Sequence, residues 1–493
     1  LDELGNTVLY GHPDAQAILT KIQVENDRLL ILRNTVEGER PAGFVSYREI
    51  GNEDLFGVLK DMELANLVRG KSSREILLIT GIYAREDGTG DSGVIRDAPQ
   101  QLLVEVLAKE LEKNYSFALF VAERGTATKE VVYVLERQGF IRPHMADEND
   151  KRTIYMVDMH EPLMFLHNLD TTIKEPFASN PAVLDAVEKN HKKLQIAMTK
   201  LYPGNLVLSL SSGIMYHRLV DRITALNDVP REPLVPRRLG KNMCVPFGKI
   251  LRGKVVPNTV TKTLHTDKVY EPDLNSFTIE PFPYYSPLKS QIETIKSFDR
   301  PVILVDDLVH TANRLQVLVP QLREDGIPIK KVVVGVLSGY GRDLMQCLKV
   351  PVESIYSMPN LRQWFVESTL YPFIGGDTVR REEMKVAGLQ PSINMILPYA
   401  TPRLSGCSRE ALVEFSACCI ENSRDLFQVL EAEYRKMYAK NLTLSRLSEA
   451  VILPLCPDKG SCMEYDENLA ASVYLENDLE MLQRMRKFMV TIQ

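Results

Sequence analysis

The sequence predicts a multidomain α/β protein. Its 493 residues correspond to roughly three domains at about 150 residues each. Apolar runs of strand length alternate with amphipathic stretches of helix length through most of the chain, and amphipathic stretches alone follow near its C-terminal end. We therefore expect a mixed-sheet domain at 1–165, a parallel-sheet domain at 175–400 and a helical C-terminal region at 401–493.

Composition places the chain among ordinary globular proteins. Hydrophobic residues make up 44% and charged residues 25% of the sequence, which excludes a wholly disordered, collagen-like or coiled-coil protein. No apolar run reaches the roughly 18 residues that cross a bilayer, so we expect no membrane partner. The formal net charge of -6 argues against a large basic surface, so we expect small-molecule substrates and no nucleic acid.

Cysteine usage favours a reducing compartment. The seven Cys residues include no pair of CxxC motifs of the kind that binds zinc. Together with the lack of a recognisable signal peptide, this pattern predicts a cytoplasmic protein with reduced thiols. The chain begins with Leu1 instead of Met, so the sequence leaves open whether a further domain precedes it.

The first domain shows a strand-rich pattern interrupted by helices. Charged turns, a glycine-rich loop and the helix-ending Gly139 separate its elements. Apolar runs predict the strands and 3.6-residue periodicity predicts the helices, which together give a mixed α/β layer structure. The expected strands lie at 29–33, 43–50, 75–83, 117–122 and 154–159, and the expected helices lie at 55–67, 99–113 and 128–138.

The glycine-rich loop of this domain has a binding pattern. Residues 85–90 read Arg-Glu-Asp-Gly-Thr-Gly, and such glycines let backbone amides approach a pyrophosphate at a helix N-terminus. This loop and the helix that ends in Gly139-Phe140 resemble the GNAT-type acetyltransferases. The resemblance implies that acetyl-CoA is a cosubstrate whose acyl group is transferred to an amine. The residues that it implies for acetyl-CoA binding are Arg85, Gly88, Thr89 and Gly90.

Two features depart from this family. About eight residues separate Gly90 from the next helix near Ala98, whereas the family's helix begins almost at once. Leu135 stands where the family often has a Tyr that serves as general acid, and Tyr133 points to another side of the helix.

The most specific motif of the chain lies at 301–314 and reads PVILVDDLVHTANR. Its apolar run at 302–305 is typical of a central strand in a parallel sheet. Asp306 and Asp307 follow this run, and a short loop leads into an apolar-periodic helix. Ligands bind at the carboxyl ends of such strands, and loop amides at a helix N-terminus attract anions. Two carboxylates beside an anion site suit ribose hydroxyls or Mg²⁺.

This motif resembles the PRPP-binding motif of the type I phosphoribosyltransferases, which have a Rossmann-like parallel sheet. The resemblance implies that Asp306 and Asp307 bind the ribose hydroxyls and that Mg²⁺ binds near them with PRPP, without an assigned protein ligand. The sequence differs from the family at Ala312, where the family has Gly, and at Arg314, where it often has Thr. An apolar strand at 206–210 precedes a turn that matches the place of the family's pyrophosphate loop. The residues implied for PRPP and phosphate binding are Ser211, Ser212, Gly213, Leu308, Val309, His310, Thr311, Ala312, Asn313 and Arg314.

A polar, Thr-rich segment at 258–268 lies between these elements. In phosphoribosyltransferases a mobile loop in this place closes over the pyrophosphate and supplies cations to the leaving group. We expect Lys262, His265 and Lys268 to have that role. A solvent-exposed β-hairpin is an equally weighted alternative, because basic residues are common in polar loops.

Together these patterns predict a transferase with two modules. One module acts on PRPP or a ribose-phosphate nucleotide, and the other transfers an acyl group from acetyl-CoA to an amine. A catalytically degenerate sensor of PRPP or nucleotides is the first alternative, since Ala312, Arg314 and Leu135 depart from the family patterns. A ribose-phosphate hydrolase is the second alternative. The sequence names neither the acceptor base nor the amine, and it leaves a homo-oligomeric state open.

Overall fold

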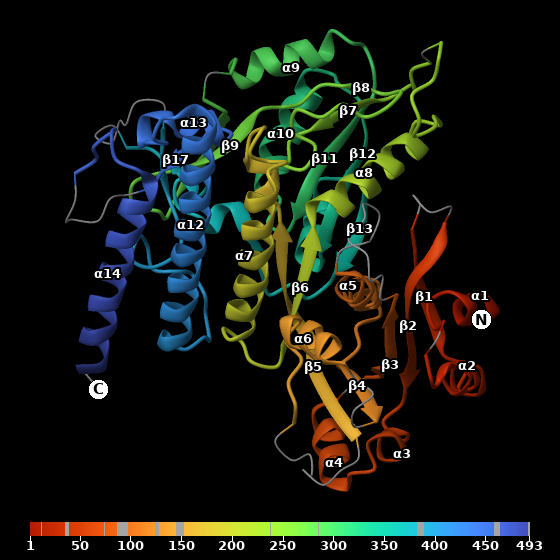
Figure 1. Cartoon of the computed structure of the whole chain (residues 1–493). Coiled ribbons are helices and arrows are strands. Elements are labelled where there is room, and N and C mark those ends of the chain that lie inside the picture. The colour runs from red at the N-terminus through yellow and green to blue at the C-terminus, as the bar shows by residue number, and fades with distance from the viewer. Residues whose placement is uncertain are drawn as a thin grey trace. The chain divides into compact units, whose positions relative to one another are not determined.

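The chain folds into two compact units. One contains Leu1–Met164, Tyr202–Ser209 and Ser357–Gln363, and the other contains Phe165–Leu201, Leu210–Tyr356 and Trp364–Gln493. No described helix is both long and apolar enough to cross a membrane. The computed structural model describes residues 1–10, 12–34, 39–72, 74–85, 97–123, 128–143, 152–236, 238–283, 285–381, 389–457 and 464–491 (Figure 1).

A mixed β-sheet organises the first unit. Its order begins β1-β2-β3-β4-β5, and β6 and β14 also belong to this sheet, each beside β5. The pairs β1–β2, β2–β3 and β4–β5 are antiparallel, whereas β3–β4 is parallel. The mixed sheet that the sequence predicts is therefore present. The strands are β1 (Arg28–Asn34), β2 (Arg40–Ile50), β3 (Ile76–Ala84), β4 (Phe117–Glu123), β5 (Arg152–His167), β6 (Asn205–Ser211) and β14 (Gln363–Val366).

The helices predicted at 99–113 and 128–138 are present, whereas the one predicted at 55–67 is divided and two helices near the N-terminus were not predicted. The single helix expected over 55–67 is two helices, α3 (Leu55–Leu59) and α4 (Met62–Lys71). Lys60 between them has a left-handed φ of 51°, and the Asp61 side chain caps α4 by accepting the Leu64 N–H at 2.9 Å. The other helices are α1 (Asp2–Asn6), α2 (Ala15–Val24), α5 (Ala98–Glu110) and α6 (Lys129–Arg137).

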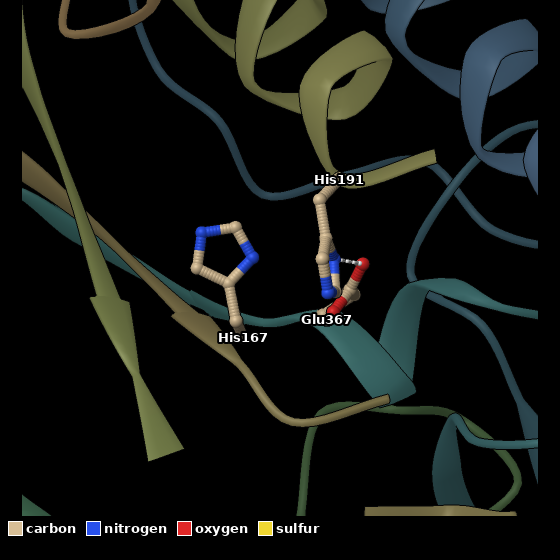
Figure 2. A group of neighbouring side chains, drawn as sticks. All are labelled: His167, His191 and Glu367. Carbon is tan, nitrogen blue, oxygen red and sulfur yellow. Dashed lines mark hydrogen bonds and ion pairs between the residues drawn. The ribbon is translucent and has the colours of Figure 1, made fainter. Parts of the chain in front are cut away.

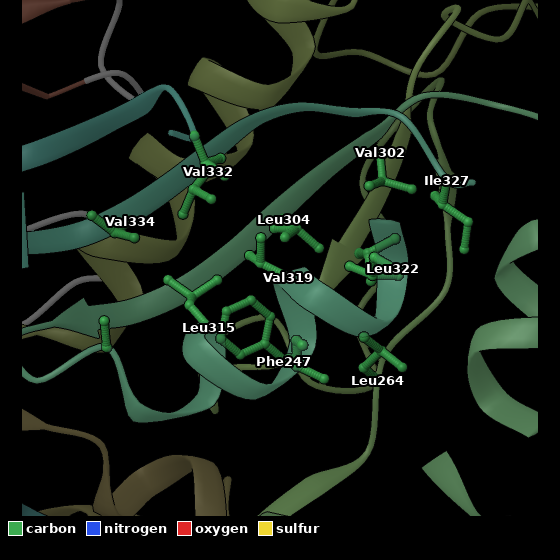
Figure 3. Close-up of a cluster of buried hydrophobic side chains, with 14 of the residues drawn as sticks. Phe247, Leu264, Val302, Leu304, Leu315, Val319, Leu322, Ile327, Val332 and Val334 are labelled. Atoms are coloured by element: carbon green, nitrogen blue, oxygen red, sulfur yellow. The ribbon is translucent and has the colours of Figure 1, made fainter. Parts of the chain in front are cut away.

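A second sheet, with the order β13-β12-β11-β7-β8, lies in the second unit. Its central strand β11 is parallel to both β12 and β7. Val302–Val305 of β11 are all buried, which explains why this run is continuously apolar. Leu315, Val319 and Leu322 of α10 pack on the same core (Figure 3). The elements are β7 (Met243–Pro246), β8 (Val260–Thr261), β11 (Val302–Val309), α10 (Asn313–Glu324), β12 (Ile329–Ser338), α11 (Gly339–Cys347) and β13 (Val352–Met358).

Strand β6 does not belong to this parallel sheet, although the sequence predicts it there. It pairs with β5 in the mixed sheet. The Val207 N–H donates to the Gln138 carbonyl at 3.0 Å. A Cβ on Gly139 would lie 2.1 Å from the Asn205 carbonyl oxygen, so glycine is needed for this close approach. The turn after α6 therefore ties β6 to the first unit, a contact that strand periodicity does not encode.

A smaller sheet, with the order β10-β9-β15-β16-β17, completes the strands of the second unit. Strands β9 and β10 form an antiparallel hairpin, and β9 also pairs in parallel with β15. The bounds are β9 (Thr266–Tyr270), β10 (Phe277–Pro281), β15 (Asp377–Val379), β16 (Gln390–Ile393) and β17 (Leu455–Cys456).

Three long helices pack together in the second unit. Helix α12 packs against both α7 and α14, and the three helices lie side by side (Figure 1). The predicted helical C-terminal region thus belongs to the same compact unit as the parallel sheet. The helices are α7 (Pro181–Thr199), α8 (Ser212–Leu226), α9 (Leu288–Lys296), α12 (Arg409–Tyr438), α13 (Leu447–Ala450) and α14 (Ala471–Thr491).

Candidate functional site

Asp307 binds the loop that follows the neighbouring strand β7. Its Oδ2 accepts the Lys249 N–H at 2.6 Å and its Oδ1 accepts the Ile250 N–H at 3.0 Å. A Cβ on Gly248 would lie 2.5 Å from Asp307 Oδ1 and 2.8 Å from Asp306 Oδ1. Glycine therefore allows this loop to pack directly onto the acid pair, and Asp307 has a structural role in addition to the one that the sequence implies.

Asp306 is largely buried beside Asp307 and Arg314. Its side chain is 12% exposed, and its Oδ1 accepts the Asp307 N–H at 2.9 Å. Arg314 Nη1 lies 3.9 Å from the same oxygen and donates to the Phe247 carbonyl at 3.1 Å. Burial raises the pKa of Asp306 to about 7, against the opposing effect of Arg314 and with a further increase from the Asp307 charge. A cation near this carboxylate would favour its ionised form.

Both acids lie inside β11, which ends at Val309, and not after the strand as the sequence suggests. Leu308 pairs with Val336 and Val309 pairs with Leu337 of β12. Val309 is also buried in the hydrophobic core. The Val309 side chain is therefore used for core packing. That Leu308 and Val309 belong to the PRPP- and phosphate-binding residues stays a prediction.

Two further basic side chains, Lys249 and Arg252, lie near the acids. Burial lowers the pKa of the Lys249 ammonium, and the charge of Arg252 lowers it further. The charges of Asp267 and Asp377 act on this pKa in the opposite direction. Burial raises the pKa of Asp377, which Lys268 and Lys249 partly oppose. The basic side chains Lys249 and Lys268 and the acidic side chain Asp377 therefore influence one another's ionisation.

Arg252 is held by an aromatic face. Its guanidinium lies 5.0 Å from the centroid of the Phe282 ring, and its buried Nε has no hydrogen-bond partner among the described residues. Burial lowers the pKa of Arg252, and the nearby charge of Arg314 lowers it further. The positive charges of Arg252 and Arg314 and the Nε–H donor of Arg252, which no described residue accepts, would together stabilise a bound anion.

The loop before α10 contains a left-handed residue. Ala312 has a left-handed backbone, with φ 50° and ψ 22°, and α10 begins at the next residue, Asn313. A non-glycine residue pays roughly 1–2 kcal/mol for this conformation. The Ala312 methyl group is buried in the hydrophobic core, which offsets part of that cost. Ala312 therefore has a backbone conformation that usually favours glycine.

The side chains of this loop have local partners. His310 Nδ1 lies 2.9 Å from Ser338 Oγ, and burial lowers the pKa of His310. Thr311 Oγ1 accepts a hydrogen bond from Asn313 Nδ2 at 2.9 Å. The loop is thus ordered by its own contacts before any ligand is considered.

Ser211 caps helix α8 by accepting the Ile214 N–H at 3.5 Å. Ser212 and Gly213 are residues of the first helical turn, and Ser212 is buried. Helix α8, which this turn starts, packs against β12 of the parallel sheet, whereas β6 before it pairs in the mixed sheet. A role of the three residues in pyrophosphate binding stays a prediction.

The predicted loop at 258–268 is partly β-structure. Lys268 lies in the β9–β10 hairpin, where its Nζ donates to the Tyr270 hydroxyl at 2.5 Å and lies 4.0 Å from the Phe277 ring centroid. Strand pairing and two aromatic rings therefore hold the half-buried Lys268, and its role at the leaving group stays a prediction. His265 stacks on Tyr285 with ring centroids 3.8 Å apart.

His265 lies within the electrostatic influence of Arg252 and Lys262. Burial lowers the pKa of His265, and the charges of Arg252 and Lys262 lower it further. The sequence had no signal for Lys249, Arg252 or Gly248 as site residues, because they lie in a loop without a recognised motif and reach the acids only through the pairing of β7 with β11.

Of the residues that the sequence implies for acetyl-CoA binding, only Arg85 belongs to the described part of the chain. Gly88, Thr89 and Gly90 lie outside the described residues. The Arg85 N–H donates to the Ala42 carbonyl at 2.9 Å, next to the end of β3. On α6, Leu135 is buried, so it belongs to the core of the first unit. The Tyr133 ring is covered by Arg137 at 4.9 Å.

Three side chains that the sequence did not single out also gather in the second unit. His167, His191 and Glu367 place one metal-ligating atom each within 4.8 Å of one another (Figure 2). They are far apart in the sequence and form no spacing motif, so only the fold could bring them to notice.

Comparison with known proteins assigns no family to this chain. No family model and no curated protein matches the chain. The NatC complex bound to Gag peptide and CoA is 11% identical, with a TM-score of 0.20, over 29% of this chain and 79% of that chain. A GNAT-family acetyltransferase from Bacillus cereus is 15% identical, with a TM-score of 0.19, over 32% and 92%.

A purine phosphoribosyltransferase from Pyrococcus horikoshii is 13% identical, with a TM-score of 0.20, over 31% of this chain and 87% of that chain. Identities and TM-scores this low assign neither a family nor an activity. What is established is an α/β protein with one mixed and one parallel sheet and a charged site on the central strand of the parallel sheet.

Proposed function

We propose that the second unit binds the ribose-phosphate part of PRPP or of a nucleotide and transfers it to an acceptor base. The observation that carries this proposal is the position of Asp306 and Asp307 on the central strand β11, just before the left-handed turn at Ala312 and the N-terminus of α10. Carboxylates suit sugar hydroxyls, and a helix N-terminus suits a phosphate. The strand and helix place both kinds of group within one short segment.

In this proposal the acids orient the ribose and the cations act on the leaving group. The bond from ribose C1 to pyrophosphate breaks while a bond from C1 to a ring nitrogen of the base forms. Arg252 and Lys249 would oppose the negative charge that develops on pyrophosphate, and the first turn of α10 would hold the 5′-phosphate. Lys262 and His265 would approach the leaving group from the segment before β9.

Mg²⁺ fits this site as a partner of the substrate. A divalent cation beside Asp306 would offset the burial that raises the pKa of this carboxyl. When bound to the diphosphate, Mg²⁺ supplies charge neutralisation to the leaving group. Asp306 is the protein group that would hold it, since Asp307 is already bonded to two backbone amides.

For the first unit we propose acyl transfer from acetyl-CoA to an amine. Support comes from the sequence of the loop with Arg85, Gly88, Thr89 and Gly90, and from the parallel β3–β4 pair that precedes and follows α5 in the chain. Leu135 is buried and apolar, so a general acid would come from another residue.

A receptor without turnover is the second candidate. It is favoured by the two hydrogen bonds that Asp307 already makes to Lys249 and Ile250, which leave it less available to a substrate. A cytoplasmic sensor of this kind would use the same residues for binding alone.

Calorimetric titration of the full chain with PRPP and MgCl₂, followed by a pyrophosphate-release assay with a panel of nucleobases, tests these candidates. Base-dependent release supports the transferase, release without a base indicates a hydrolase, and binding without release indicates a receptor. Asp306→Asn should weaken binding, whereas Asp343→Asn, at an exposed position on α11, should not. Lack of PRPP binding by the folded wild type would overturn the proposal.

A further inference from the structure

Three side chains of the kind that bind metal ions come together from separate elements of the second unit. His167 is the last residue of β5, His191 lies on α7, and Glu367 begins a short 3-10 helix (Glu367–Leu370). Figure 2 shows the two imidazole rings and the carboxylate facing a common region. One ligating atom of each lies within 4.8 Å of the others, and the two ring centroids are 4.4 Å apart.

The carboxylate of Glu367 is the second observation that points to a ligand. Its side chain is 0% exposed. Oε1 contacts His191 Nδ1 and accepts the Tyr371 hydroxyl at 3.5 Å. Oε2 is buried and has no hydrogen-bond partner in the described part of the chain. A buried carboxylate oxygen without a partner is costly, because it has lost its water without compensation. A cation bound at Oε2 would supply that compensation.

Surrounding contacts hold the three residues in place. Gln195 Nε2 lies 2.9 Å from His167 Nε2, a contact that joins α7 to the end of β5 beside the cluster. The Ser368 N–H donates to Asn168 Oδ1 at 3.0 Å, which joins the start of the 3-10 helix to the end of β5. The segments that carry His167 and Glu367 are thereby connected next to the cluster.

We propose that His167, His191 and Glu367 form a zinc site. Two imidazoles and one carboxylate are a ligand set that suits Zn²⁺, whereas Mg²⁺ and Ca²⁺ prefer oxygen ligands alone. Three protein ligands leave a fourth position for water, as in zinc sites that act on small molecules. Tetrahedral ligands at about 2.0–2.2 Å from the ion require the side chains to move slightly closer than they are now. None of the three belongs to the PRPP or acetyl-CoA residues, so this site is independent of the proposed transferase function.

The test uses the full chain after treatment with a chelator and dialysis. Titration with ZnCl₂, with bound metal measured by mass spectrometry, should give one equivalent in the wild type and in His217→Gln, which alters an exposed histidine of α8. Glu367→Gln, His191→Gln and His167→Gln should each lower zinc affinity at least about tenfold, as expected for loss of one metal ligand or its charge. Circular dichroism confirms that each variant is folded.

The cysteines are unchanged in all these variants, so zinc held by thiols would remain and would contradict the proposal. Equal zinc content in wild type and variants, or no zinc binding by the wild type, would mean that the cluster is a histidine–glutamate ion pair only. If the variants do not fold, Co²⁺ added to the wild type decides. Tetrahedral d–d bands without a thiolate charge-transfer band support the site, and a thiolate band or no tetrahedral band overturns it.

Discussion

Asp307 Oδ2 accepts the backbone N–H of Lys249 at 2.6 Å, so a residue that the sequence marks for sugar binding also fixes a neighbouring loop. The same carboxylate accepts the Ile250 N–H through its other oxygen. Lys249 is in turn one of the cations of the site. The acid pair and the cationic loop are therefore one structural element, and changes at Asp307 should alter both stability and ligand binding.

Asp307→Asn should reduce the free energy of unfolding by about 1–3 kcal/mol, because one carboxylate oxygen becomes an NH₂ group that faces a backbone donor. PRPP binding should weaken by at least about 1 kcal/mol through loss of a charge-assisted hydrogen bond. Urea unfolding and calorimetry measure the two effects, with Asp343→Asn as the exposed control. Wild-type affinity for PRPP in the folded variant would remove Asp307 from the site.

The free energy of unfolding should fall as the pH rises through the range in which Asp306 titrates. Its folded-state pKa is raised from 3.8 to about 7, so the folded protein holds a proton that the unfolded chain releases above pH 4. The resulting stabilisation is complete below about pH 4 and is lost as pH increases to about 7, by an amount on the order of 4 kcal/mol. Unfolding free energies at pH 5 and pH 8 measure the part of this loss that falls above pH 5.

Asp306→Asn serves as the reference for this pH dependence, since it removes the titrating group and keeps the shape. The variant should lose less stability than the wild type between pH 5 and pH 8. The same pH dependence in both proteins would assign the effect to other groups.

Substitution of Ala312 tests the left-handed turn. Ala312→Gly should change the free energy of unfolding by less than about 1 kcal/mol, because relief of the left-handed backbone offsets the loss of a buried methyl group. Ala312→Val should be destabilising by about 2 kcal/mol or more, since a β-branched residue is least tolerant of positive φ. Thermal unfolding of both variants measures this, and a Val variant as stable as the wild type would contradict the turn.

Gly88→Val tests the acetyl-CoA loop. The larger side chain should keep the backbone amides away from the pyrophosphate and abolish acetyl-CoA binding, while PRPP binding stays at the wild-type level. Calorimetry with each ligand separates the two modules. Normal acetyl-CoA binding by this variant would show that the glycine-rich segment is only a turn.

Much of the local structure was predictable from sequence. The apolar run of β11 predicts its burial because both faces of a central parallel strand are covered. Gly139, with φ +90°, ends the helix that periodicity predicts. The prediction of one helix over 55–67 was wrong at Lys60, where a left-handed residue divides the segment into two helices. Neither the apolar pattern nor the composition of the segment reveals that conformation.

What the sequence by itself determined was the identity of the short-range units: apolar strands, amphipathic helices, and the acid pair next to a helix start. The tertiary structure alone decided which of these units meet. It paired β6 with the mixed sheet, brought Lys249 to Asp307, and gathered His167, His191 and Glu367. The physical reason is that periodicity records which side of an element is buried, whereas the partner that buries it depends on packing between residues far apart in the chain.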